Sequence, residues 1–70
     1  MRFSRHAKNE MRLYGIRPAD IEAVVASPVE TQFDQSGNWR LTGLDVERRA
    51  IIVVLAGDEP SFVITTFPDD

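Results

Sequence analysis

The chain has 70 residues and a formal net charge of −3, so residues 1–70 are expected to form a single domain with a modest core. Its hydrophobic content of 43% and charged content of 27% are ordinary for a globular protein and argue against a disordered tail. With no cysteine and one histidine, the chain cannot form a disulfide framework or a cysteine-based zinc site, and we expect no metal and no cofactor.

The first predicted element is an amphipathic helix from Ser4 to about Tyr14. Ser4 is a suitable N-cap, and Gly15 can adopt the positive φ that ends many helices. At about 100° per residue, one side of this helix is apolar and the other is basic. The apolar side is formed by Phe3, Ala7, Met11 and Tyr14. The basic side is formed by Arg5, Lys8 and Arg12.

A second helix is predicted to begin at Pro18, because proline suits the first helical position. Asp20 lies two residues later, where a carboxylate meets the positive end of the helix dipole. Arg17 would be the N-cap, which is a poor choice of residue, so we expect this helix to start less well sealed than the first. The Ser27-Pro28 dipeptide ends it.

The rest of the chain predicts four strands joined by short turns. They are residues 29–34, 39–42, 50–56 and 61–67. The first two alternate apolar and polar residues, whereas 50–56 is apolar on both faces and is therefore expected to be the most buried, central strand. Pro68 is expected to end the last strand. We therefore predict an α+β fold, with two N-terminal helices packed on one face of a four-stranded, largely antiparallel sheet.

No segment is predicted to enter a membrane. The longest apolar run, residues 50–56, has seven residues, which suits a strand and is too short for a membrane span. The basic residues near the N-terminus precede no apolar run, so no signal peptide is evident. We therefore expect a cytoplasmic protein without a membrane partner.

His6 is the residue best suited to acid–base chemistry, because only histidine has an unperturbed pKa near neutrality. It would stand at the shoulder of the apolar stripe of the first helix. As a functional residue it would act as a general acid or base beside a bound phosphate. As a structural residue it would cap the core and hydrogen-bond the sheet. The sequence leaves both interpretations open.

Arg12 is the strongest phosphate-binding candidate of the basic cluster that also contains Arg5 and Lys8. Residues 1–17 carry a net charge of +4, and residues 18–70 carry −7. The alternative is a solvated helix face. The sequence pI of about 5.0 is also unlike that of a dedicated nucleic-acid binder.

Arg40 and Thr65 are the candidates on the predicted sheet. Arg40 alternates with Trp39, so it would lie on an open sheet face if the helices cover the Trp39 face. Such a face is either a ligand surface or an ordinary polar surface. Thr65 is explained equally well as a strand-forming residue, and Trp39 is expected in the core.

The chain resembles a bacterial family known as domain of unknown function 4258. The opening Phe3–Ala7, Met11-Arg12 and Tyr14–Ile16 resembles the family pattern H-A-x-x-R-M-x-x-R-G-I, although Leu13-Tyr14 replaces the usual basic residue before glycine. Further similar segments are Pro18–Val25, Trp39–Gly43 and Val63–Pro68. The resemblance covers nearly the whole chain, and the order and spacing of the motifs carry it.

That family is similar in layout to RelE- and BrnT-like toxins, which are small α+β ribonucleases. The resemblance therefore implies a RelE/BrnT-like fold and metal-independent RNA cleavage. His6 would be the acid or base, Arg12 and Arg40 would bind phosphate, and Thr65 would be a polar contact. Two features depart from this pattern: the chain is acidic, and it lacks the C-terminal segment of BrnT-like proteins.

Two hypotheses follow, from different functional classes. In the first, which is the leading one, the protein is a toxin-like or vestigial ribonuclease whose partners are RNA and an antitoxin protein. In the second, it is a non-catalytic interaction module or a small homodimer, because a small sheet must cover its exposed edges and no catalytic residues cluster in the sequence.

Overall fold

Two helices and five strands make up the structure, a computed structural model that describes residues 1–70. In chain order they are β1 (Arg2–Phe3), α1 (Arg5–Tyr14), α2 (Pro18–Ala26), β2 (Glu30–Phe33), β3 (Trp39–Leu44), β4 (Ala50–Leu55) and β5 (Phe62–Pro68).

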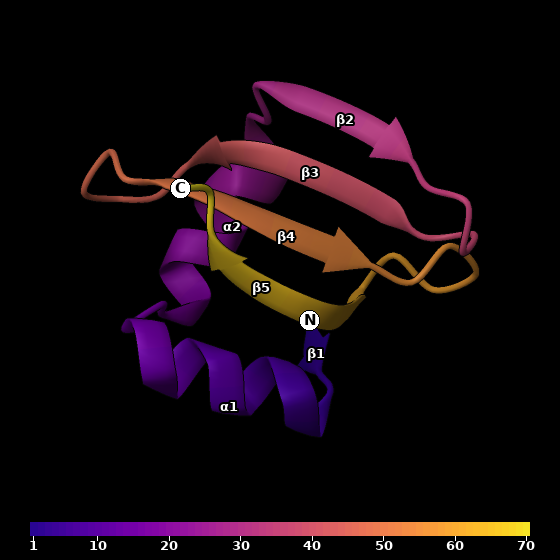
Figure 1. Ribbon diagram of the computed structural model, residues 1–70, viewed down its shortest axis with the longest axis horizontal. Helices are drawn as coiled ribbons and strands as arrows, with labels where there is room; N and C mark the ends of the chain where they lie inside the picture. The colour runs from indigo at the N-terminus through magenta and orange to yellow at the C-terminus, as the bar shows by residue number, and fades with distance from the viewer.

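All five strands belong to one sheet in the order β1-β5-β4-β3-β2. β2 to β5 form an antiparallel meander, as predicted, and β4 is the central strand. Figure 1 shows this meander with α2 behind it and α1 beside β5. The prediction of four strands was wrong, because β1 adds a fifth strand that runs parallel to β5 and makes the sheet mixed.

β1 was missed because two residues carry no periodicity. The Arg2 N–H donates to the Ser61 carbonyl at 2.8 Å, and the Ser4 N–H donates to the Val63 carbonyl at 2.9 Å. Phe3, predicted on the apolar side of the first helix, therefore lies in this strand and packs against the core from there. Only a partner some sixty residues away in the chain makes Arg2–Phe3 a strand.

Both predicted ends of α1 are confirmed. The Ser4 Oγ accepts a hydrogen bond from the Ala7 N–H at 2.9 Å, which caps the helix, and donates one to the Ile64 carbonyl at 2.6 Å. Gly15 ends the helix in the left-handed conformation with a φ of 66°. The Ser4 side chain thus fixes the start of the helix directly to β5.

The N-terminus of α2 is better capped than the sequence suggested. Arg17 is the N-cap residue, as predicted, but its own side chain does not cap the helix. Instead, the Asp20 Oδ2 accepts a hydrogen bond from the Arg17 N–H at 2.8 Å. The carboxylate at the third helical position therefore supplies the reciprocal half of a capping box, in which the N3 side chain accepts from the N-cap N–H.

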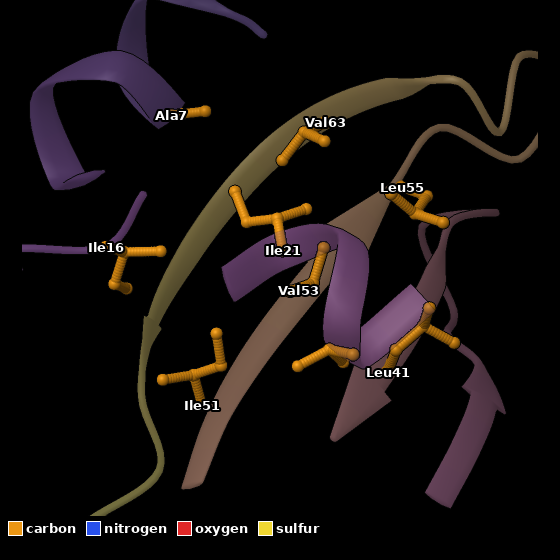
Figure 2. Close-up of a cluster of buried hydrophobic side chains, with 9 residues drawn as sticks. Ala7, Ile16, Ile21, Leu41, Ile51, Val53, Leu55 and Val63 are labelled. Carbon is orange, nitrogen blue, oxygen red and sulfur yellow. The ribbon is translucent and has the colours of Figure 1, made fainter. Parts of the chain in front are cut away.

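The hydrophobic core lies between the helices and one face of the sheet, as predicted (Figure 2). Its buried members are Ala7, Ile16, Ile21, Val24, Leu41, Ile51, Val53, Leu55 and Val63. The three β4 residues in this group alternate along the strand, so the residues between them face away from the helices. The packed face is called the helix side below.

The last strand continues one residue further than predicted, because Pro68 lies opposite Ile51. Proline is tolerated there, since it is the final residue of the strand and no further ladder follows. The expected turn at residues 35–38 is confirmed. It is closed by Asp34, whose Oδ1 accepts hydrogen bonds from the Ser36 and Asn38 N–H groups at 2.9 Å.

Candidate functional site: the open face of the sheet

The face of the sheet opposite the helices carries no helix (Figure 1), and it is called the open face below. The strand register sets its side chains in rows. One row runs Arg40, Val54, Thr65, and the next runs Thr42, Ile52, Phe67. Arg2 and Phe62 share this face where β1 meets β5, and Glu30 and Gln32 share it on β2.

The centre of the open face is apolar, although no helix covers it. Ile52 is 5% exposed and Val54 is 6% exposed. Their cover comes from the neighbouring side chains in the two rows, which include Arg40 and Phe67. The open face therefore has an apolar centre that larger side chains cover. It differs from the polar face that an antiparallel sheet usually turns to solvent.

Two arginines lie over aromatic rings on this face. The Arg40 Cζ is 5.6 Å from the centroid of the Phe67 ring, and the Arg2 Cζ is 5.1 Å from that of Phe62. Arg2 also forms an ion pair with Glu59, whereas Arg40 forms no ion pair within the chain. Arg40 therefore presents a positive charge that no acidic side chain of this protein neutralises.

The four predicted site residues do not meet in one place. Arg40 and Thr65 lie in the same row of the open face, on either side of Val54. His6 and Arg12 are exposed on α1, which packs against β5 and β1 and not against β3. Neither His6 nor Arg12 forms a side-chain hydrogen bond or an ion pair. The structure thus unites two candidates and separates the other two from them.

Trp39 lies on the helix side, as expected, but it is not a core residue. The part of the helix side formed by β3 is covered only by α2, because α1 packs on β5 and β1. Trp39 is therefore 36% exposed and contacts Phe33 edge-to-face, with ring centroids 4.8 Å apart. This exposed aromatic pair marks the part of the helix side that α2 does not reach.

Two buried carboxylates, which the sequence did not single out as a pair, tie the turn between β3 and β4 to the helices. Asp20 Oδ1 accepts a hydrogen bond from the Val46 N–H at 3.1 Å. Asp45 accepts hydrogen bonds from the Arg49 backbone N–H at 2.7 Å and from its Nε at 3.1 Å. Arg49 in turn donates to the Tyr14 carbonyl at 2.9 Å. Both carboxylates are fully partnered within the chain, so their role is structural.

Burial by itself raises the pKa of Asp20, but the hydrogen bonds from Arg17 and Val46 and the Arg17 charge outweigh it. The net result is an Asp20 pKa below its ordinary value, so the carboxylate is held in its ionised form.

The structure contains no enclosed pocket, and no group of three or more His, Cys, Asp or Glu side chains gathers as a metal site. Neither helix has the length and the apolar character needed to cross a membrane.

The open-face residues Ile52, Val54 and Phe67 were not predicted as part of a site. A signal for two of them was present in the sequence, because a strand that is apolar on both faces requires cover on both faces. By itself the pattern predicts a central strand, and it does not say what covers the second face.

The chain matches the sequence model of a known family. The sequence model of the family described as "Domain of unknown function (DUF4258)" matches residues 3–68. No curated protein and no solved structure matches the chain.

Proposed function

This chain belongs to the DUF4258 family, and we propose that it is a non-catalytic interaction module that binds a partner protein on the open face. The observation that carries the proposal is the apolar centre of that face, where Ile52 and Val54 lie on the side of β4 that no helix covers. Antiparallel sheets with one solvated face normally alternate apolar and polar residues. A central strand that keeps both faces apolar fits a sheet that is covered on both sides.

The chemistry of the open face defines the kind of partner. Ile52 and Val54 are already buried by their neighbours, so a partner would meet the apolar strip through the half-buried Phe67 ring, which favours apolar side chains. Arg40, which has no acidic partner in the chain, favours a carboxylate at the same place. Electrostatic complementarity of this kind selects partners and sets their orientation. The expected occupant is an apolar protein segment with an acidic residue, and an antitoxin would be one protein of this class.

We expect Arg40→Glu to weaken partner binding at least tenfold, because the change sets like charges against each other at the contact. The immobilised chain would be used to capture partners, which are then purified and titrated against each variant. Arg12→Glu is the matched control, since it makes the same charge reversal on the exposed side of α1. A partner that binds Arg40→Glu as tightly as the wild type would overturn the proposal.

The second candidate is a RelE/BrnT-like toxin that cleaves RNA without a metal. It is favoured by the row that holds Arg40 and Thr65, whose backbones are two strand spacings, about 10 Å, apart. Both side chains are suited to phosphate contacts at that separation. Two observations weigh against it: His6 lies outside this row on α1, and no other histidine is present to serve as acid or base.

An assay with labelled RNA and EDTA separates the two candidates. If the protein is an interaction module, no cleavage is expected from the wild type, His6→Ala or Arg40→Ala. Cleavage that survives chelation and disappears in Arg40→Ala would establish the ribonuclease instead. His6→Ala is expected to change the free energy of unfolding by less than about 0.5 kcal/mol, because His6 is exposed and makes no hydrogen bond.

A further inference from the structure

β2 is an edge strand with little protection against pairing with the strand of another chain. All four of its residues, Glu30–Phe33, are exposed, and it pairs only with β3. Natural edge strands are usually shielded by lysine, proline, a bulge or a covering element. The opposite edge has such a shield, because α1 packs beside β5 and β1 is only two residues long. β2 is twice as long as β1, no element covers it, and its only such device is the single charged side chain of Glu30.

The backbone of β2 has hydrogen-bonding groups directed away from the sheet. The Asp34 N–H donates to the Asn38 carbonyl at 2.8 Å. In an antiparallel ladder, every second residue is bonded to its partner strand, so the bonded residues of β2 are expected to be Gln32 and Glu30. The N–H and C=O groups of Thr31 and Phe33 therefore point outward, toward any strand that adds to this edge.

We propose that a second copy of this chain pairs with β2, antiparallel and about a two-fold axis at Thr31. A two-fold axis normal to the sheet keeps the helix side of both copies together, so only residues on the same face can stand opposite each other. An axis at Thr31 sets Thr31 against Thr31 of the second copy, and Glu30 against Gln32 of the second copy. Facing threonines are favourable cross-strand pairs.

The side chains of β2 favour a two-fold axis at Thr31 over one shifted by a residue to Gln32. Within one chain, the Gln32 Nε2 already donates to the Glu30 Oε2 at 3.4 Å, so amide and carboxylate share the open face. An axis at Gln32 would set Glu30 against Asp34 of the second copy, and like charges directly opposite are destabilising. The Thr31 register avoids this repulsion and replaces it with two amide–carboxylate pairs.

The same register brings together two exposed apolar residues. Phe33 would stand beside Val29 of the second copy, and because the Val29 N–H already donates to the Thr42 carbonyl at 2.7 Å, only the two side chains are expected to meet. Phe33 is 58% exposed and Val29 is 75% exposed, the latter being the most exposed large hydrophobic residue of the chain. Pairing at β2 would remove part of both surfaces from water and join two five-stranded sheets into one. The pairing uses the backbone edge of β2, whereas the proposed partner contact centres on Phe67 and Arg40, so the inference does not rest on the proposed function.

Single-cysteine variants test the register, because the native chain has no cysteine. Facing hydrogen-bonded residues have Cα atoms about 5.5 Å apart, which a disulfide can span. Thr31→Cys is therefore expected to cross-link to itself rapidly under mild oxidation. Gln32→Cys is the matched control, since it is equally exposed but would lie about 8 Å from its own copy. A mixture of Glu30→Cys and Gln32→Cys is expected to form the mixed disulfide.

Substitutions that change the charge at Gln32 provide a second test of the dimer, one that needs no cross-linking. Gln32→Lys, facing Glu30 of the second copy, is expected to tighten the dimer about threefold to tenfold, and Gln32→Glu to weaken it by a similar factor. Within the chain Gln32 stands opposite Arg40, so any effect on folding has the reverse sign. Sedimentation would measure the dimer and thermal unfolding the fold. A wild type that stays monomeric at millimolar concentration, or equal cross-linking of Thr31→Cys and Gln32→Cys, overturns the inference.

Discussion

Asp20→Ala is expected to lower the free energy of unfolding by about 2 to 4 kcal/mol. The Asp20 carboxylate accepts hydrogen bonds from the backbone N–H groups of Arg17 and Val46, and alanine would leave both donors without this partner. The change would also remove the capping interaction at the start of α2 and the hydrogen bond that holds the turn between β3 and β4 to this helix. Small domains have only about 5 to 10 kcal/mol of total stability, so the loss should be plain in urea or thermal unfolding.

Glu22→Ala is the matched control, because Glu22 is an exposed carboxylate of the same helix. It should change the stability by less than about 0.5 kcal/mol. Asp20→Asn should fall between the two, since the amide keeps one acceptor oxygen. If Asp20→Ala and Glu22→Ala are equally stable, the carboxylate does not hold the two segments together.

The same residue predicts a sign for the pH dependence of stability. The pKa of Asp20 is lower in the folded protein than in the unfolded chain, where it is about 3.9. The stability that the ionised carboxylate provides is therefore present above the unfolded value and is lost as the pH falls through the folded pKa. The difference in unfolding free energy between wild type and Asp20→Asn should accordingly shrink below about pH 4. A difference that grows in acid would contradict the assignment.

Gly57→Ala is expected to destabilise the protein by about 3 kcal/mol or more. A Cβ atom at Gly57 would overlap with the carbonyl oxygen of Gly37, and it would lie 3.3 Å from the Phe33 ring. The Gly57 N–H also donates to the Asn38 Oδ1 at 3.3 Å. The loop between β4 and β5 therefore rests backbone-to-backbone on the hairpin turn between β2 and β3, and a side chain would force the two apart.

Gly15→Ala is the comparison for this change. Gly15 has a φ of 66° but no neighbouring atom within 4 Å of an added Cβ, so only backbone strain opposes the change. A cost of about 1 kcal/mol is expected. In thermal unfolding, each kcal/mol corresponds to a shift of roughly 4 to 8 °C for a domain of this size. Equal shifts in melting temperature for Gly57→Ala and Gly15→Ala would contradict a close contact between the β4–β5 loop and the β2–β3 turn.

Local signals in the sequence were sufficient for most elements. Ser4, Gly15 and Pro18 mark helix ends through their own backbone and side-chain chemistry, and the structure confirms each of them. The seven-residue apolar run at residues 50–56 predicted the central strand. The prediction that Arg40 lies away from the helices also follows from alternation alone, once the helices cover the Trp39 face. Residues that act through neighbours four or fewer positions away are the ones that local reasoning finds.

Contacts between distant parts of the chain account for what was missed. β1 depends on hydrogen bonds to Ser61 and Val63, and the exposure of Trp39 depends on where α2 stops along the sheet. Which of the candidate site residues lie together also depends on contacts between distant parts of the chain. His6 and Arg40 lie in different elements, and only the strand order shows that β4 and β5 separate β3 from α1.

Local patterns in the sequence were enough to predict the two helices and the four-stranded meander, because periodicity and end signals are local properties of the chain, whereas the face that the helices cover was left conditional. The tertiary structure alone decided that β1 joins β5, that Arg40 and Thr65 share a row without His6, and that β2 is left as an open edge. These features are set by strand register and by the area the two helices can cover, and both are fixed only when segments distant in the sequence pack together.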